Sequence, residues 1–297
     1  MEMNWGRVIT AMATPFGPDG QLDEARAAQL AVRLMETGTD ALVVCGTTGE
    51  APTLSDEEKI RLVRAVKGAV GGRVPVIAGT GTYDTAHSIH LSEEAKRAGA
   101  DGLLLVVPYY NRPSQEGIYR HFRTIAERVD LPILLYNIPA RTGTNMLPET
   151  VARLSEIPNV VGVKDASGSP DQVSEIRRRT PEGFLIYSGD DSLTLPYLSV
   201  GAVGVVSVAS HLVGREIGEM IDLFFAGRVA EARRLHLRLY PLFRVLFIAP
   251  NPVPLKAALD LVGFPIGAPR LPLVEATEKE REQIGAVLRE LAVAAVA

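Results

Sequence analysis

Val160-Val161-Gly162-Val163-Lys164-Asp165 is a short β-branched run that ends in a lysine and an aspartate. Its apolar residues follow one another instead of alternating with polar ones, which is typical of a strand covered on both faces. Strands of this kind form parallel sheets, because the helices that connect parallel strands pack on both sides of the sheet. The run therefore predicts a buried parallel strand with Lys164 at its carboxyl end.

Seven similar runs are spaced along the chain and predict seven further strands. They occupy residues 8–13, 41–45, 74–78, 102–107, 133–136, 184–187 and 204–208. Amphipathic segments with readable helix ends lie between the runs. The predicted helices with two readable ends cover residues 22–37, 59–70, 82–98, 114–128 and 215–226. A capping box at residues 55–58 precedes the second of these. Two further helices have a readable start only, one at Pro148 and one at a second capping box, residues 169–172.

The alternation of strand and helix repeats eight times and indicates an α/β protein with a parallel sheet. Eight units favour closure into a (β/α)8 TIM barrel. An open doubly wound sheet is the competing fold, but residues 14–18 are not the glycine-rich phosphate loop that usually follows its first strand. We assign the barrel to residues 1–226. We expect residues 227–297 to form a C-terminal helical region packed on it, with helices at residues 229–247, 254–262 and 275–295.

The composition is that of an ordinary soluble globular protein. The 297 residues are 46% hydrophobic and 22% charged, and the net charge of −4 offers no attraction for nucleic acid or an anionic membrane. Residues 1–7 show no basic-then-apolar stretch, so we expect no signal peptide there. No apolar run approaches the roughly 20 residues that span a bilayer. The one cysteine, Cys45, lies in an apolar run and predicts a buried core thiol. These features favour a cytoplasmic protein.

Chemically versatile residues follow the predicted strands, at the end where a parallel barrel places its active site. They are Thr14, Gly46-Thr47-Thr48-Gly49-Glu50, Thr80 and Thr82, Pro108-Tyr109-Tyr110-Asn111, Tyr136 and Asn137 with Arg141 beyond, Lys164 and Asp165, Ser188-Gly189-Asp190-Asp191, and Ser207. If the barrel closes, we expect these groups to converge on one face of it.

The side chains expected at this face of the barrel are suited to carbonyl chemistry on an anionic substrate. Burial favours the neutral form of an amine, and the neutral amine of Lys164 is a nucleophile that can form a Schiff base with a ketone. A tyrosine beside such an amine can move the protons that imine formation requires. The glycines around Thr47 and Thr48 let backbone N–H groups approach a carboxylate, and the planar guanidinium of Arg141 matches a second one.

Each feature taken singly has a simpler interpretation. Lys164 could hold its ammonium in solvent at a strand end, and residues 46–49 could be a tight turn. The pair Asp190 and Asp191 lacks the histidine or third carboxylate of a metal site, so loop capping is the better interpretation and we expect no metal. Convergence at one face of the barrel is what favours the functional interpretation.

The ordered set of motifs resembles the dihydrodipicolinate synthase family, which belongs to the pyruvate-dependent class I aldolases related to N-acetylneuraminate lyase. The motifs are Gly46-Thr47-Thr48-Gly49-Glu50, Tyr109-Tyr110-Asn111-Arg112-Pro113, residues 136–143, Val163-Lys164-Asp165 and Ser188-Gly189-Asp190-Asp191. The resemblance extends from about Ile9 to at least Asn251-Pro252. It implies an enzyme that uses no cofactor.

The resemblance also implies roles for particular residues. Lys164 would form a Schiff base with pyruvate. Tyr136 would relay protons to and from it while hydrogen-bonded to Thr47, and Tyr110 would reach in from a neighbouring subunit. The protein would therefore be a homotetramer or homodimer, and the sequence leaves open which.

Four further residues would bind the substrates. Thr48, together with Thr47, would hold the carboxylate of pyruvate, and Arg141 would bind the carboxylate of L-aspartate 4-semialdehyde. Gly189 and Val206 would contribute backbone groups near the site.

Thr47-Thr48 and Arg141 favour the synthase members of this group, since sialic-acid lyases and sugar-acid aldolases commonly lack this arginine and carry serine before threonine. The implied reaction condenses pyruvate with L-aspartate 4-semialdehyde to 4-hydroxy-tetrahydrodipicolinate, in lysine and diaminopimelate biosynthesis. Two alternatives stay open. One is an aldolase or lyase for another 2-keto acid, such as a sialic or sugar acid, and the other is a non-catalytic barrel that binds a keto acid.

One departure from the family concerns feedback by lysine. Lysine-inhibited members carry a glutamate on a helix and a histidine or tryptophan in an earlier loop. The corresponding positions here are His87 and Asp56, and Tyr83 stands where asparagine is common. Nothing obvious would pair with the ammonium of the inhibitor, so we expect weak or absent inhibition by lysine.

Overall fold

The computed structural model describes residues 5–293, and within them eight parallel strands close into a barrel in the order β1 to β8. The closed barrel confirms the predicted fold class. The predicted ends differ most at residues 8–13, where the strand stops at Ala11, and at residues 74–78, where it begins at Val76. The strands are β1 Val8–Ala11, β2 Ala41–Val44, β3 Val76–Gly79, β4 Gly102–Val106, β5 Ile133–Asn137, β6 Val160–Asp165, β7 Leu185–Ser188 and β8 Gly204–Ser207.

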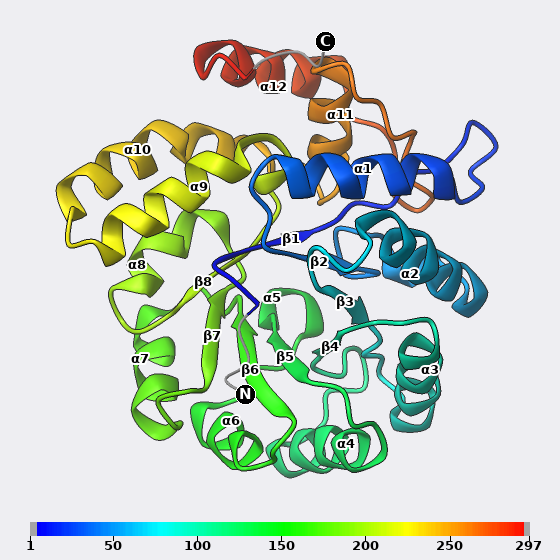
Figure 1. Ribbon diagram of the computed structural model, residues 1–297, viewed down its shortest axis with the longest axis vertical. Helices are drawn as coiled ribbons and strands as arrows, with labels where there is room; N and C mark the ends of the chain where they lie inside the picture. Colours follow the sequence, from blue (N-terminus) through cyan, green and yellow to red (C-terminus); the bar gives the residue numbers. More distant parts are fainter. Residues whose placement is uncertain (1–4, 294–297) are drawn as a thin grey trace.

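Helices surround the barrel in the predicted order (Figure 1). The longer ones are α1 Glu24–Glu36, α2 Asp56–Val70, α3 Thr85–Arg97, α4 Gln115–Arg128, α6 Pro148–Ser155, α7 Pro170–Arg179 and α9 Ser210–Phe225. Short elements that the sequence did not predict lie in the loops after the strands. They are the 3-10 turns Ala51–Thr53 and Asp191–Leu193 and the helices α5 Pro139–Thr142 and α8 Thr194–Leu198.

The two predicted capping boxes have different outcomes. At the start of α2, Ser55 and Glu58 cap each other's backbone groups, so that box is confirmed. At the start of α7, the side chain of Ser169 accepts from the N–H of Gln172, but the side chain of Gln172 turns inward to the carboxylate of Asp165. The second prediction is therefore half wrong, because the Oε1 atom of Gln172, which a capping box would use to accept from Ser169, instead accepts a hydrogen bond from Nδ2 of Asn145 at 2.7 Å.

The barrel has two apolar layers, one inside the strands and one between strands and helices. The inner layer contains Ile9, Ile77, Leu104, Leu134 and Val206, and it is closed near the amino ends of the strands by Trp5. Three inward positions lie in register on neighbouring strands, where Tyr136 of β5 pairs with Lys164 of β6 and Lys164 pairs with Tyr187 of β7. Strand register thus sets a lysine between two tyrosines.

Beyond the barrel, the chain forms α10 Val229–Val245, α11 Val253–Leu261 and α12 Glu278–Glu290. In Figure 1, α10 runs beside α9 and α11 lies near α1. The last helix, α12, packs against α11 and α10. The end predicted for the last helix, Ala295, lies outside the described residues. The division into a barrel of residues 1–226 and a helical region of residues 227–297 stays a prediction. In the described part of the chain, no helix combines the length and apolar character that crossing a membrane requires.

Candidate active site

Lys164 lies inside the barrel, and its residue is only 6% exposed. Its Nζ atom is 4.1 Å from the centre of the Tyr136 ring. Within residues 5–293, no hydrogen-bond or ion-pair partner is recorded for this Nζ atom. The alternative of a lysine with its ammonium in solvent is therefore wrong. The structure instead shows a lysine buried inside the barrel, whose amine lies over the Tyr136 ring and has no hydrogen-bond or ion-pair partner among the described residues.

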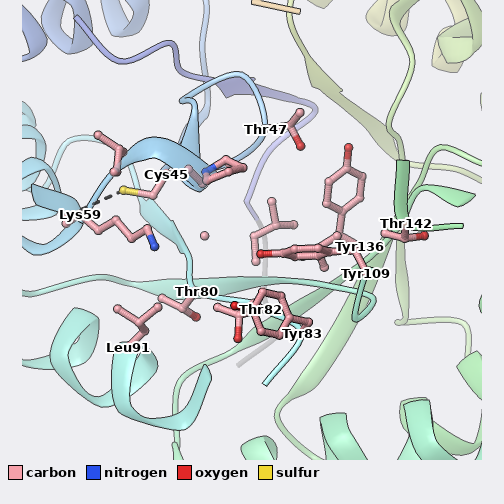
Figure 2. Close-up of a pocket in the computed structure, with 18 of the residues that line it drawn as sticks. Cys45, Thr47, Lys59, Thr80, Thr82, Tyr83, Leu91, Tyr109, Tyr136 and Thr142 are labelled. Atoms are coloured by element: carbon pink, nitrogen blue, oxygen red, sulfur yellow. Dashed lines mark hydrogen bonds between the residues drawn. The ribbon is translucent and has the colours of Figure 1, made fainter. Parts of the chain in front are cut away.

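A cavity of about 520 Å³ opens at the carboxyl ends of β2 to β5. Three of the predicted site residues, Thr47, Tyr136 and Arg141, line it. Figure 2 shows Thr47, Tyr136 and Tyr109 on one side of the cavity and Lys59 on the other. Lys164 is not among the lining residues and reaches this region beside the ring of Tyr136.

The expected hydrogen bond between Tyr136 and Thr47 is not formed, so this expectation is wrong. Neither side-chain hydroxyl has a hydrogen-bond partner in the described part of the chain. Both side chains line the cavity, so the space in front of them is available to a ligand. Hydroxyl groups left free at a cavity wall can donate to or accept from a substrate.

The loop after β2 has the features of an anion site. Among residues 5–293, no recorded acceptor takes a hydrogen bond from the backbone N–H of Thr47 or Thr48. The carbonyl of Gly49 accepts a hydrogen bond from the Thr14 hydroxyl at 2.7 Å, which ties the loop to the segment that follows β1. Successive free N–H groups on a fixed turn form a concavity that suits a carboxylate.

Thr48 itself is buried, and it does not line the cavity. Its Oγ1 atom accepts a hydrogen bond from the Nδ2 atom of Asn251 at 2.9 Å. In the sequence, Asn251 marks only the end of the resemblance, and this contact was not predicted. Nothing in the sequence pairs residues that lie 203 positions apart.

Arg141 lies on α5, at the mouth of the cavity. It is exposed, and no ion pair engages its guanidinium within the described residues. A free guanidinium beside a cavity is available to form a bidentate pair with a carboxylate.

Gly189 lies next to Lys164, whereas Val206 lies in the inner apolar layer of the barrel. The N–H of Gly189 donates to the carbonyl of Asp165 at 2.7 Å, so this donor is already used. A Cβ atom on Gly189 would lie 3.2 Å from Cε of Lys164 and 2.7 Å from Cβ of Ala166, so a larger residue would crowd the lysine. Val206 is buried in the inner layer of the barrel.

Tyr110 is not brought to the site within this chain. It is 93% exposed, it does not line the cavity, and its backbone has φ +70°, a value that non-glycine residues rarely adopt. The chain therefore holds a large aromatic side chain in solvent at the cost of backbone strain.

A buried polar network fixes the end of β6. The carboxylate of Asp165 accepts hydrogen bonds from the Ser167 hydroxyl at 2.5 Å, from Gln172 and Asn137 at 3.1 Å each, and from the Tyr197 hydroxyl at 3.2 Å. A carboxylate buried with several donors is held rigidly. The network therefore fixes the backbone next to Lys164.

Asp190 and Asp191 cap loops, as predicted. Asp190 accepts from the backbone N–H of Ser192 at 2.8 Å, and Asp191 accepts from the N–H groups of Val208 and Ala209 at 3.0 Å each. Burial raises the pKa of Asp191 to about 6, against the opposing effect of its hydrogen bonds.

The far end of the cavity holds the three residues at the positions expected to govern feedback by lysine. Asp56, Tyr83 and His87 all line it. Asp56 is 2.7 Å from Nε2 of His87 and 3.6 Å from Nζ of Lys59. Partial burial works against ionisation of Asp56, but the hydrogen bond and charge of His87, helped by Lys59, lower the pKa of its carboxyl.

Cys45 also borders this end of the cavity, and burial raises the pKa of its thiol to about 12. A thiol with this pKa stays protonated near neutral pH, which supports the predicted core role.

Comparison with known proteins identifies the family. The model of the dihydrodipicolinate synthetase family matches residues 4–291. The 4-hydroxy-tetrahydrodipicolinate synthase of Desulforamulus reducens is 57% identical over 290 residues, which cover 97% of this chain and 98% of the relative. That of Heliobacterium modesticaldum is 59% identical over 278 residues, covering 94% of this chain and 93% of the relative.

Solved structures of related proteins are also similar. The dihydrodipicolinate synthase of Cyanidioschyzon merolae, solved with lysine bound, has a TM-score of 0.96 and 49% identity, and the match covers 97% of this chain and 99% of that one. A dihydrodipicolinate synthase from Bacillus anthracis has a TM-score of 0.95 at 49% identity, with 97% and 98% coverage. The chain belongs to the dihydrodipicolinate synthetase family.

Proposed function

We propose that this chain is a lyase that condenses pyruvate with L-aspartate 4-semialdehyde to give 4-hydroxy-tetrahydrodipicolinate. Nearly full-length relatives at 55–59% identity are named for this activity. The observation that carries the proposal is the amine of Lys164, which is buried beside Tyr136 and has no protein partner in the described residues. The non-catalytic barrel does not account for an unpaired amine held at this position.

In the first half of the proposed reaction, Lys164 attacks the ketone carbon of pyruvate and loss of water gives the imine. Tyr136 lies against the amine and moves the protons that addition and dehydration require. The backbone N–H groups of Thr47 and Thr48 hold the pyruvate carboxylate, with the hydroxyls of both threonines as further donors. Loss of a proton from the methyl carbon converts the imine to the nucleophilic enamine.

In the second half, the enamine carbon attacks the aldehyde carbon of L-aspartate 4-semialdehyde. Arg141, at the cavity mouth, binds the carboxylate of that substrate and orients it. The amino group of the substrate then attacks the imine carbon, closes the ring and releases Lys164 as the free amine. All of these steps use side chains and backbone groups of the protein, without a cofactor.

The proposed enzyme is a homo-oligomer, either a dimer or a tetramer. The support is Tyr110, which is exposed in one chain and held there in a strained backbone conformation. In an oligomer, this phenol would join the proton relay of the neighbouring subunit.

A panel of aldehydes tests the substrate assignment. Purified protein is assayed with pyruvate and, in turn, L-aspartate 4-semialdehyde, N-acetylmannosamine and small sugar aldehydes. We expect kcat/KM to be highest for L-aspartate 4-semialdehyde. A preference for N-acetylmannosamine or a sugar aldehyde would instead assign the chain to the other 2-keto acid aldolases, and no turnover with any aldehyde would favour a binding protein.

A further inference from the structure

The C-terminal helical region contributes a side chain to the anion loop. Asn251, which precedes α11, donates from Nδ2 to Oγ1 of Thr48 at 2.9 Å. Both residues are buried, with 7% and 2% of their surfaces exposed. The other amide atom of Asn251, Oδ1, is buried without a hydrogen-bond partner among the described residues. The bond to Thr48 is therefore the hydrogen bond that orients this amide.

The direction of this bond has a chemical consequence. An amide nitrogen can only donate, so the Thr48 oxygen accepts and its own proton stays available. A hydroxyl that accepts one bond within the protein can still donate to a carboxylate. Asn251 therefore fixes the rotamer of Thr48 and the direction in which the Thr48 hydroxyl can donate a hydrogen bond.

A second contact braces the same loop against the same C-terminal segment. Nζ of Lys256 on α11 lies 2.7 Å from Oε1 of Glu50, and the two side chains are 4% and 1% exposed. The other oxygen of Glu50 accepts from the backbone N–H of Arg270 at 2.9 Å. A buried ion pair with this additional hydrogen bond holds a fixed geometry. Residues 46–50 are thus held from the C-terminal side at Thr48 and at Glu50.

We propose that Asn251 is a positioning residue for the pyruvate carboxylate, acting through the hydroxyl of Thr48. This inference rests on the proposed function, because it assumes that Thr48 faces a carboxylate. It makes the C-terminal region part of the substrate site instead of a support for the barrel alone.

The test measures the pyruvate concentration that gives half-maximal borohydride-trapped adduct, by mass spectrometry of the intact protein. We expect Asn251→Ala to raise this concentration at least about tenfold, equivalent to about 1.4 kcal/mol. The extent of trapping at saturating pyruvate should change far less. Asn251→Asp should have a larger effect, because its carboxylate accepts the Thr48 proton and repels the substrate.

Two controls separate positioning from stability. In a Thr48→Val background, where the hydroxyl is gone, Asn251→Ala should cause no further change in the half-saturating concentration. Asn159→Ala removes an amide that donates to the carbonyls of Ala126 and Val129 at 3.1 and 2.8 Å, remote from the cavity. It should lower the melting temperature and leave pyruvate saturation unchanged.

Three results would overturn the inference. Normal pyruvate saturation in both Asn251 variants, with adduct still formed, would remove the role of Asn251 and leave the proposed function intact. Equal losses from Asn251→Ala in the wild-type and Thr48→Val backgrounds would show that Asn251 does not act through Thr48. No adduct in the wild-type protein would reject the proposed function itself, and the inference with it. If Asn251→Ala fails to fold, the nearly isosteric Asn251→Asp is compared with the wild-type protein in the same way, in both the wild-type and the Thr48→Val backgrounds.

Discussion

At the scale of single residues, the proposed chemistry depends on one amine that the fold buries and leaves unpaired. The other well-buried lysine, Lys256, forms an ion pair with Glu50, whereas Lys164 contacts the face of an aromatic ring. Burying an amine without a partner is costly, so such groups are found where a protein uses them. The difference between these two lysines separates a structural role from a chemical one.

The variant Arg141→Ala tests whether Arg141 binds the carboxylate of L-aspartate 4-semialdehyde. Loss of a charge-assisted pair of about 1.5–3 kcal/mol should raise the KM for L-aspartate 4-semialdehyde roughly 10- to 100-fold. Half-saturation by pyruvate should change little, because pyruvate binds at the loop after β2. Steady-state kinetics with each substrate varied in turn measures both. Arg120→Ala, which removes an exposed arginine on α4, is the control. An equal loss for both substrates would contradict the carboxylate role of Arg141.

The sequence predicted Lys164, Tyr136 and Arg141 at one face because each lies at or just beyond the carboxyl end of a strand. In a parallel barrel, these strand ends meet at one face. It could not predict Asn251, because a contact across 203 positions depends on how the C-terminal helices dock. The expected bond between Tyr136 and Thr47 was wrong for a similar reason. Hydrogen bonds between loop side chains depend on rotamers, which the local sequence does not determine.

At the scale of elements, the loops after the strands carry the chemistry and the helices hold them. The loop after β4 extends Tyr110 into solvent, and α2 and α3 bring Asp56 and His87 together. The sequence identified α2 by its capping box. It did not predict α8, a helix of 5 residues that lacks a side-chain cap, because short helices are stabilised by tertiary contacts and not by local signals.

Tyr110→Phe tests whether subunits share a site. If its phenol belongs to the proton relay, kcat should fall at least about tenfold, since such relays contribute roughly 10²–10⁴-fold. The KM values should change less, since the ring is kept. Tyr240→Phe, which alters an exposed tyrosine on α10, is the matched control and should retain full activity. Wild-type kcat in Tyr110→Phe would mean that this phenol takes no part in the reaction.

Response to lysine tests the far end of the cavity. Asp56 is already paired with His87 and Lys59, and the ammonium of Lys59 would repel that of a lysine ligand. We therefore expect weak or no inhibition when lysine is titrated into the condensation assay. His87→Glu should strengthen inhibition by adding a carboxylate at the cavity, whereas His90→Glu, at an exposed position, should not. Inhibition of the wild-type protein at sub-millimolar lysine would refute this account.

At the scale of the whole molecule, the closed barrel places charge-bearing groups in surroundings that water does not reach. His211 is buried beneath β1, where Nε2 accepts from the N–H of Ala13 at 3.1 Å and Nδ1 lies 2.8 Å from the carbonyl of Val208. Burial lowers the pKa of His211 to about 4, although its hydrogen bond to Val208 opposes the shift. Its folded-state pKa is therefore below the value of about 6.5 expected in an unfolded chain.

The stability of the fold should consequently depend on this histidine in mild acid. Between pH 4 and 6.5, the unfolded chain binds more protons at His211 than the folded chain does. The neutral histidine therefore contributes fully to the free energy of unfolding above about pH 6.5, and this contribution is lost as the pH falls toward 4. At pH 5, the free energy of unfolding should be about 2 kcal/mol lower than at pH 7 because of this histidine. Asp191, with its pKa raised to about 6, acts in the opposite direction because its contribution is lost as the pH rises through 6.

A comparison of variants isolates the histidine. His211→Gln should show a smaller fall in melting temperature between pH 7 and pH 5 than the wild-type protein, as measured by circular dichroism. His90→Gln, at an exposed position, should show the wild-type fall. The same pH dependence in His211→Gln as in the wild-type protein would contradict this assignment.

The central claim is that Lys164 is the nucleophile, and borohydride trapping with pyruvate followed by peptide mapping tests it most directly. The account predicts a reduced pyruvate adduct on the peptide that contains Lys164, no adduct in a folded Lys164→Ala variant, and no modification of Lys59 or Lys256. An unmodified Lys164 in pyruvate-treated wild-type protein, or an adduct on another lysine that persists in Lys164→Ala, would contradict it.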